Sequence, residues 1–167
     1  MHNYIPQSFT KLIIFLGLLA HFTGCNASTS KHLKSYQKGV MTLPNGESFL
    51  VYIAKTSAQQ KLGLSKIKAE DFSINEGMLF PEEKMFMRQF WMPETHFDLD
   101  VFFLNEDYYV LDIHRGLRHN SNPIKSYRDR QNTSFSKKVF SQHVLELRSD
   151  SAFAKKIRPG MLLKFKY

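Results

Sequence analysis

The sequence predicts an α+β domain that is mainly antiparallel β, with about eight short strands and two short helices. Three observations support this prediction. The apolar segments after residue 39 are short and rich in aromatic and β-branched residues, which favour strands. Turn-forming residues separate these segments at close intervals. The composition does not change along this region, so we expect one small partly closed barrel or sandwich-like domain.

The first elements are predicted to be a β-hairpin and a helix. Asn45 and Gly46 lie between two apolar runs, and this pair tolerates the positive φ angles of a tight hairpin turn. Thr56 is expected to cap the helix, and Gln59 would complete a capping box with it. Gly63 is placed to end the helix, because glycine readily adopts the left-handed conformation of a C-cap.

The other elements follow from apolar runs and the turns between them. A second short helix is expected at residues 149–156, followed by a turn at Pro159 and Gly160. Residues 115–138 show no apolar period and are predicted to form a long loop. The eight expected strands cover residues 40–43, 48–54, 78–80, 86–92, 99–104, 108–114, 143–147 and 161–165.

The N-terminal region has the pattern of a secretory signal. Lys11 precedes a nine-residue apolar run, residues 12–20, which is too short to span a bilayer as a helix. The residues before Cys25, Phe22-Thr23-Gly24, then resemble a bacterial lipobox. This resemblance implies cleavage before Cys25 and attachment of lipid, including palmitate-type acyl chains, to that residue. The alternative is a cleaved signal that leaves an ordinary free cysteine.

These features divide the chain into three parts. Residues 1–24 are expected to be the lipoprotein signal peptide, residues 25–38 the lipidated cysteine and a flexible tether, and residues 39–167 the single mostly-β domain. The protein is therefore expected in the bacterial cell envelope, held to a membrane through Cys25. Asn26 is not acidic, so we expect the outer membrane where there are two.

The charge of the chain limits its partners. Its 167 residues carry a net charge of +8, which favours anionic surfaces, and export argues against nucleic acid. Basic side chains are concentrated in the loop at residues 115–138. This loop is a candidate contact for anionic lipid or a cell-wall polymer, and the alternative is a solvated loop that charge keeps soluble.

Several short segments occur in a characteristic order and spacing. Together, from Val51 to Phe165, they resemble the uncharacterised family called domain of unknown function 192. The resemblance implies a small, mostly-β domain that is often exported and has no established activity. The segments are Gly63-Leu64, Gly77-Met78-Leu79-Phe80, Phe90-Trp91-Met92 with Thr95, Leu99-Asp100 before Phe102-Phe103, Val144-Leu145-Glu146-Leu147, Ile157 and Pro159-Gly160.

The main functional hypothesis is a domain that binds a ligand or partner and carries no cofactor and no catalytic residue. Asp100 and Glu146 each lie in an apolar strand, where a carboxylate is costly to bury without a partner. Trp91 is the only tryptophan and is expected to form a pocket wall. The candidate binding groove comprises Met78, Phe80, Trp91, Met92, Thr95, Asp100 and Glu146.

Two alternatives and a simpler interpretation remain open. Two carboxylates that converge beside Trp91 can bind a sugar or cation and can perform acid–base catalysis, so an enzyme that acts on envelope polysaccharide, with Asp100 and Glu146 as its carboxylates, is the first alternative. Periplasmic copper binding is the second alternative, because thioethers suit Cu(I). In the simpler interpretation Asp100 binds backbone amides at a turn and Glu146 faces water. No zinc-ligand spacing and no Gly-x-Ser-x-Gly motif occur. The copper candidates are Met85, Met87, Met92 and His96.

Overall fold

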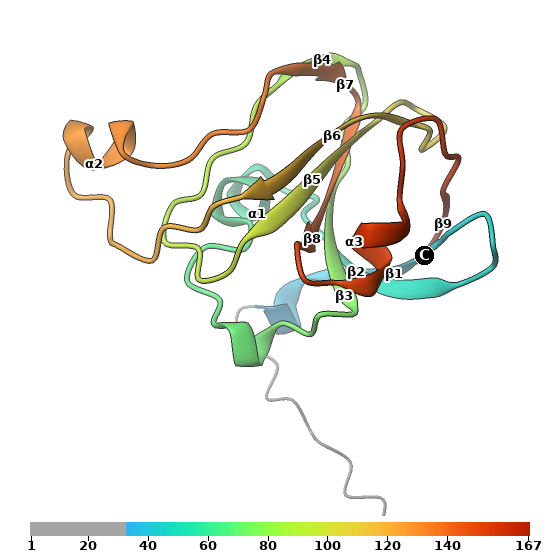
Figure 1. The fold of residues 1–167 in the computed structure, drawn as a ribbon, viewed down its shortest axis with the longest axis horizontal. Coiled ribbons are helices and arrows are strands. Elements are labelled where there is room, and N and C mark those ends of the chain that lie inside the picture. The colour runs from blue at the N-terminus through green and yellow to red at the C-terminus, as the bar shows by residue number, and fades with distance from the viewer. Residues whose placement is uncertain (1–32) are drawn as a thin grey trace, which may run out of the picture.

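The computed structural model describes residues 33–167, which form a mostly-β domain with nine strands, three short α-helices and two 3-10 turns (Figure 1). Cys25, the predicted signal peptide and most of the predicted tether lie outside the described residues. The strands are β1 (Gln37–Thr42), β2 (Ser48–Ile53), β3 (Glu76–Phe80), β4 (Phe86–Arg88), β5 (Leu99–Leu104), β6 (Val110–Leu117), β7 (Val139–Ser141), β8 (His143–Arg148) and β9 (Lys164–Lys166). The helices are α1 (Ser57–Leu62), α2 (Tyr127–Gln131) and α3 (Ala152–Lys156), and the 3-10 turns are Leu33–Ser35 and Ala69–Asp71.

Seven strands form one curled sheet in the order β6-β5-β8-β3-β2-β1-β9, and its pairs are antiparallel except for β2 and β3. The segment before β9 returns to the opposite edge, where Tyr109 forms a bridge with Leu162. Val110 N also donates a hydrogen bond to Met161 O at 2.8 Å. These contacts draw the two edges together, so the partly closed barrel is the correct form of the expected architecture.

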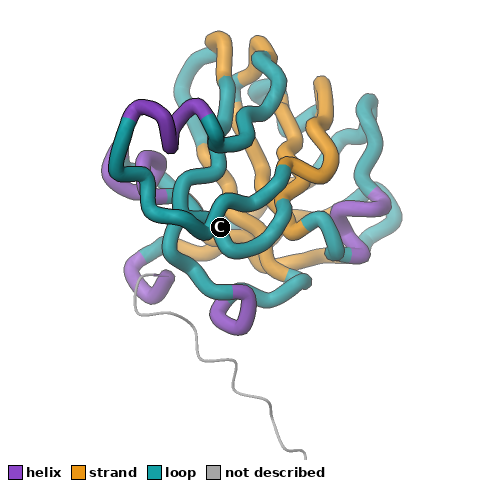
Figure 2. Tube along the Cα trace, turned by 60° about the vertical axis from the view of Figure 1, so that its left-hand side comes forward, coloured by secondary structure: helices purple, strands orange, loops and turns teal. Residues whose placement is uncertain are grey.

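Each face of the curled sheet carries its own hydrophobic core, because successive side chains of a strand point to opposite faces. The inner core includes Phe102, Leu145 and Leu147 and is covered by α3 through Ala154 and Ile157. The outer core is covered by connecting segments, and Figure 2 shows loops and short helices around the strands. Its members are Leu33, Tyr36, Tyr52, Ala54, Leu64, Ile67, Phe72, Met78, Phe80, Met92, Phe97, Leu99, Val101, Phe103, Leu117 and Val144.

The local predictions for the first elements are confirmed, with one correction. Thr56 and Gln59 form the expected capping box, and Gly63 ends α1 with a φ of 49°. Residues 43–47 connect β1 to β2 as a hairpin. Only Gly46 has a positive φ, 88°, whereas two such residues were expected. The three-residue loop Pro44-Asn45-Gly46 needs a single left-handed residue at its end.

The predicted strand at residues 86–92 is wrong in extent. Its first three residues form β4, which lies outside the main sheet and pairs with β7 (Figure 1). Residues 90–92 have only an isolated bridge between Trp91 and Phe135. The aromatic and apolar character that predicted a strand instead serves packing against the outer core, where Met92 is 1% exposed.

The predicted loop at residues 115–138 is also shorter than expected. Strand β6 continues to Leu117, and α2 begins after Ser126, whose side chain accepts a hydrogen bond from the Asp129 amide. The final strand begins at Lys164 rather than at Met161, because the preceding residues pair with the opposite edge of the sheet. Within residues 33–167, no helix has both the length and the apolar character needed to cross a membrane.

Candidate functional site

A small cavity lies on the outer face of the sheet, between α1 and the segment that follows β4. Its volume is about 50 Å³, enough for a few water molecules or one small functional group. The walls combine apolar and aromatic side chains with polar ones, and Glu146 is the acidic residue among them. The lining residues are Gln60, Lys61, Leu62, Gly63, Leu64, Ser65, Phe80, Phe90, Trp91, Met92, Pro93, Thr95, Leu99 and Glu146.

Strand β8 places the Glu146 side chain in this cavity. The residue lies between Met78 of β3 and Val101 of β5 in the sheet, and both neighbours belong to the outer core. Glu146 is 4% exposed, and none of the residues described donates a hydrogen bond to its carboxyl group. Burial raises the pKa of this carboxyl to about 8, although the positive charge of Arg88 acts in the opposite direction.

Arg88 is the charged residue that acts electrostatically on the Glu146 carboxyl. Its guanidinium is buried and donates hydrogen bonds to Phe80 O at 3.1 Å and Gln142 O at 2.8 Å. The group also lies over the rings of Phe86 and Phe90, 5.2 Å from each centroid. Burial lowers the pKa of Arg88. Arg88 therefore holds β4 against the sheet and adds positive potential beside the cavity without forming an ion pair with Glu146.

Trp91 forms the outer wall of the cavity and is covered by the long connection between β6 and β7. The Phe135 ring stacks on the Trp91 ring with centroids 6.3 Å apart and an interplanar angle of 15°. The Arg130 guanidinium lies 5.2 Å from the Trp91 ring centroid. Met92 N donates to Ser134 O at 3.2 Å, and this backbone contact fixes the connection beside the wall.

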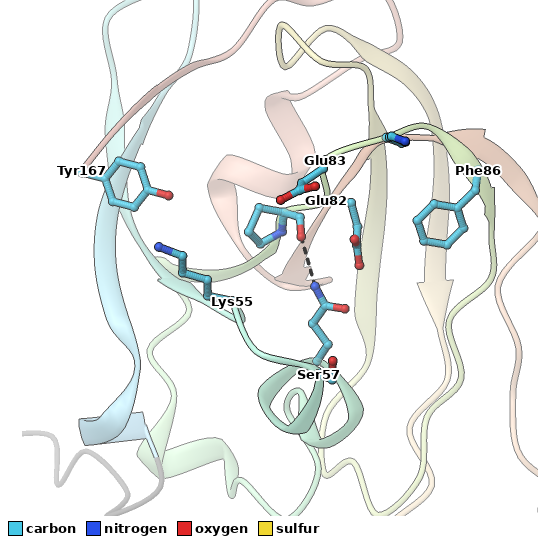
Figure 3. Close-up of a pocket in the computed structure, with 9 residues that line it drawn as sticks. Lys55, Ser57, Glu82, Glu83, Phe86 and Tyr167 are labelled. Atoms are coloured by element: carbon cyan, nitrogen blue, oxygen red, sulfur yellow. Dashed lines mark hydrogen bonds between the residues drawn. The ribbon is translucent and has the colours of Figure 1, made fainter.

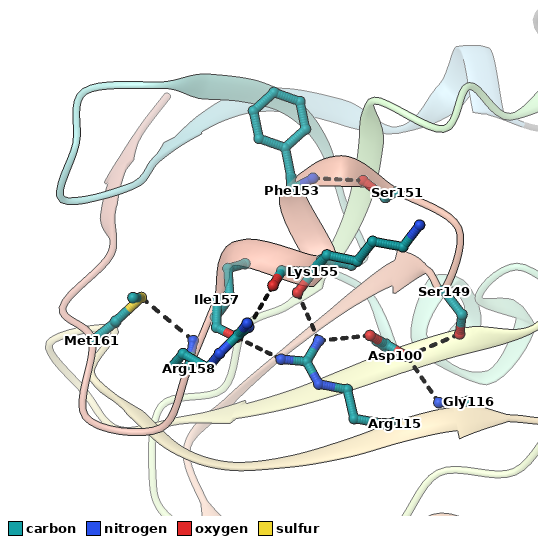
Figure 4. A network of polar contacts seen from close by, with 11 residues as sticks. Asp100, Arg115, Gly116, Ser149, Ser151, Phe153, Lys155, Ile157, Arg158 and Met161 are labelled. Atoms are coloured by element: carbon teal, nitrogen blue, oxygen red, sulfur yellow. Dashed lines mark hydrogen bonds and ion pairs between the residues drawn. The ribbon is translucent and has the colours of Figure 1, made fainter.

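Asp100 lies on the opposite face of the sheet, where it is fully engaged (Figure 4). Arg115 Nη1 donates to its Oδ2 at 2.6 Å, and Gly116 N and Ser149 Oγ donate to its Oδ1 at 2.8 and 2.9 Å. Arg115 also donates to the carbonyl oxygens of Ala154 and Ile157. Asp100 thus orients an arginine that fastens the C-terminal end of α3 to the sheet.

The structure therefore brings together five of the seven residues predicted for the binding groove. Phe80, Trp91, Met92, Thr95 and Glu146 line the cavity. Met78 is the neighbour of Glu146 on β3 but is completely buried and does not line the cavity. Asp100 and Glu146 point to opposite faces, since Asp100 pairs with Leu147 in the register. The interpretation of these two carboxylates as one catalytic pair is wrong for this reason.

The methionines proposed as copper ligands lie in different environments. Met92 is 1% exposed in the outer core, whereas Met87 is 57% exposed on β4. His96 is exposed. Among residues 33–167 no three His, Cys, Asp or Glu side chains are grouped as a metal site. No feature of this arrangement favours a copper site.

Sequence reasoning missed the polar residues that α1 and its flanks bring to the cavity. Gln60 and Lys61 lie on α1, and Ser65 donates a hydrogen bond from Oγ to Pro93 O at 2.8 Å. It also missed Arg88, although an arginine inside an apolar run was a usable signal for burial with a polar partner. The polar residues on α1 gave no such signal, because an exposed helix face is ordinarily polar.

The fold and cavity define a class of protein: a small curled-sheet β domain with a lone buried acid in a pocket. The model of the uncharacterised family DUF192, described as uncharacterized ACR, matches residues 40–165. The chain belongs to this family, as the segments from Gly63 to Gly160 indicated.

Two solved structures share the fold. One is described as a candidate transcription regulator from Sinorhizobium meliloti 1021, with a TM-score of 0.59, 24% identity and coverage of 78% of this chain and 95% of that one. The other is a protein of unknown function from Novosphingobium aromaticivorans DSM 12444, with a TM-score of 0.55, 25% identity and coverage of 77% and 84%. No curated protein matches the chain.

Proposed function

We propose that the protein is a lipid-anchored envelope protein whose β domain binds a ligand by enclosing one small group of it above Glu146. The observation that carries this proposal is the buried Glu146 carboxyl, which lines a cavity and lacks a hydrogen-bonding partner among the described residues. The carboxyl faces the cavity, and a ligand that hydrogen-bonds to it there gains affinity, because a hydrogen bond is stronger in a partly desolvated site than in water.

The dimensions of the cavity restrict what enters it. A volume of about 50 Å³ admits a functional group but not a whole sugar ring. The rest of the ligand lies outside, against the open surface between α1 and β4. This surface begins at residues that also line the cavity, namely Gln60, Lys61, Phe80, Phe90 and Trp91. Binding of this kind needs no second carboxylate, so it is compatible with the separation of Asp100 from Glu146.

The membrane anchor in this proposal is supported by the sequence. The apolar run at residues 12–20 and the lipobox-like residues before Cys25 lie outside the described part of the chain. Mass spectrometry of the full chain purified from bacterial membranes tests it. We expect cleavage before Cys25 and the added mass of acyl chains, with both lost in a Cys25→Ser variant. An intact leader with an unmodified thiol contradicts the anchor.

The basic part of residues 115–138 is the proposed contact for anionic lipid or cell-wall polymer. Arg115 is occupied by Asp100, but Arg118, Lys125 and Arg128 are exposed. Sedimentation of the full chain with insoluble anionic cell wall tests this contact. We expect a Lys125→Gln/Arg128→Gln variant to bind less at low salt, whereas equal binding contradicts the proposal.

Ligand binding is tested through the Glu146 carboxyl itself. We propose to label the glutamates of the full chain with ¹³C in detergent and to assign the Glu146 carboxyl signal with a Glu146→Gln variant. Acetate, acetamide, methylammonium and glycerol then serve as small probes. We expect at least one to move the Glu146 signal in a saturable way and to leave the exposed Glu70 signal in place. If none moves it, the cavity is structural.

A further inference from the structure

We propose that the group bound above Glu146 is a carboxylate, carried at the end of an extended ligand that continues along the surface between α1 and β4. This inference rests on the binding function proposed above and adds the chemical class of the ligand. It depends on three features: the hydrogen-bonding state of Glu146, the charges around the cavity, and the grooves that continue from it.

The first feature is that Glu146 can donate a hydrogen bond. The residue is 4% exposed and lies between Met78 and Val101 of the outer core, and a buried carboxyl without an ionic partner retains its proton. With a pKa of about 8 it is mainly protonated at neutral pH. A protonated acid that donates to a carboxylate oxygen forms a short, charge-assisted hydrogen bond. The carboxylate is therefore a better partner than a neutral carbonyl.

The second feature is the positive charge around the cavity. Lys61 lines it and forms no ion pair with any residue of the described range, so its ammonium is available to a ligand at the mouth. Arg88 acts on Glu146 electrostatically, and Arg130 lies over Trp91. This potential opposes an ammonium ligand. The charged groups on the elements around Glu146 and the adjoining groove are Lys61, Glu76, Glu82, Arg88, Glu94 and Arg148.

Two of the three acids in this set are already neutralised or occupied, and the third, Glu82, lies in the groove outside the cavity and acts electrostatically on Arg88. Glu94 forms an ion pair with Lys66 at 3.4 Å, and Glu76 accepts hydrogen bonds from Tyr52 Oη and Ser73 N. Arg148 is bound to Asp150, with Nη2 and Oδ2 2.8 Å apart. The groups that remain to act on a ligand in the cavity are therefore Glu146, Lys61 and Arg88.

The third feature is a continuous path away from the cavity. A groove of about 390 Å³ starts at the cavity wall and runs past Phe86, Arg88 and Gln89. It shares Ser57, Gln60, Glu82 and Phe86 with a larger open pocket of about 660 Å³ that extends to Tyr167 (Figure 3). Gln60 Nε2 donates to Pro81 O at 3.0 Å and so links α1 to the opposite wall. An extended chain fits this path better than a compact molecule.

The test compares three probes that differ in their terminal group: N-acetylglycylglycine, its C-terminal amide, and butylammonium. Binding to the full chain in detergent is followed by the ¹³C signal of Glu146 and by Trp91 fluorescence between pH 6 and 10. We expect the free acid to bind and the other two to bind at least tenfold more weakly. Its affinity should fall about tenfold by pH 9, as Glu146 loses its proton and repels the ligand.

Two variants sharpen the result. Glu146→Gln keeps a neutral donor in the same shape, so the acid should still bind, detected by Trp91 fluorescence, but without the decrease above pH 8. Lys61→Gln should lower the affinity for N-acetylglycylglycine by up to about fivefold, which is the range that an exposed ion pair contributes. Lys68→Gln is the matched control, since Lys68 is exposed, is absent from the cavity and pairs with Glu70.

The outcomes separate this inference from the function on which it rests. Tighter binding of butylammonium, with affinity that rises with pH, overturns the carboxylate and leaves ligand binding at Glu146 intact. Equal binding of the acid and its amide also overturns the carboxylate proposal, because the negative charge of the probe then makes no contribution to affinity. If neither these probes nor the four small probes move the Glu146 signal, both proposals fail.

Discussion

Replacing Glu146 by glutamine should remove a large dependence of stability on pH. The unfolded chain ionises near the ordinary glutamate pKa of 4.5, whereas the folded chain does so near 8. Between these values the folded state holds the proton and the unfolded state has lost it. Stability therefore falls as the pH rises from about 4.5 to about 8 and is level above that.

The magnitude follows from the two pKa values. Moving the pKa from 4.5 to about 8 corresponds to a loss of about 5 kcal/mol of unfolding free energy at alkaline pH. This is a large share of the 5–15 kcal/mol, roughly, that stabilises a typical domain. Glutamine has nearly the shape of the protonated acid and cannot ionise. The variant should match the parent chain near pH 4 and exceed its stability by several kcal/mol at pH 9.

Urea unfolding of the full chain at pH 5, 7 and 9, followed by Trp91 fluorescence, measures this difference. His143 is buried and His114 is partly exposed, and desolvation lowers the pKa of both. Their contributions are common to both proteins and cancel in the comparison. Glu70→Gln is the control, because Glu70 is exposed on a 3-10 turn. Parallel pH profiles for the parent chain and Glu146→Gln would refute the reasoning.

Three further predictions concern the structure around the site. Asp100→Ala leaves Gly116 N and Ser149 Oγ without their shared acceptor and removes one of the three hydrogen bonds of Arg115, whose side chain is 39% exposed. It should cost about 2–3 kcal/mol, measured by urea unfolding, and a loss under 1 kcal/mol contradicts the fastening role of Asp100. Gly77→Ala places a methyl group 2.8 Å from Leu147 Cδ2 and should cost about 1–3 kcal/mol, whereas Gly46→Ser, at a position with open space but a φ of 88°, should cost less. Phe135→Ala removes the ring stacked on Trp91 and should shift the fluorescence emission of this single tryptophan to longer wavelength, with about 1 kcal/mol of lost stability. An unchanged emission spectrum shows that Phe135 does not cover Trp91 in solution.

Local chemistry explains which elements were predictable. The capping box at Thr56 and Gln59 involves residues three apart, and the hairpin turn at Gly46 is closed by its own neighbours. Such contacts join residues that are close together in the sequence, so they form without the help of a distant segment. The same argument fails for residues 86–92, because an apolar run indicates burial without indicating which surface covers it. Here β4 pairs with β7, about fifty residues later in the chain.

The sequence by itself determined the family, the mostly-β composition and the two apolar strands that each carry one carboxylate. Only the tertiary structure decided that these two carboxylates lie on opposite faces of the sheet and have different surroundings. On the inner face, β6 and the turn after β8 supply Arg115, Gly116 and Ser149 to Asp100. On the outer face, α1 and Trp91 leave a cavity above Glu146. A strand sequence fixes which side chains share a face, but the partners that meet that face come from distant segments whose approach depends on the whole fold.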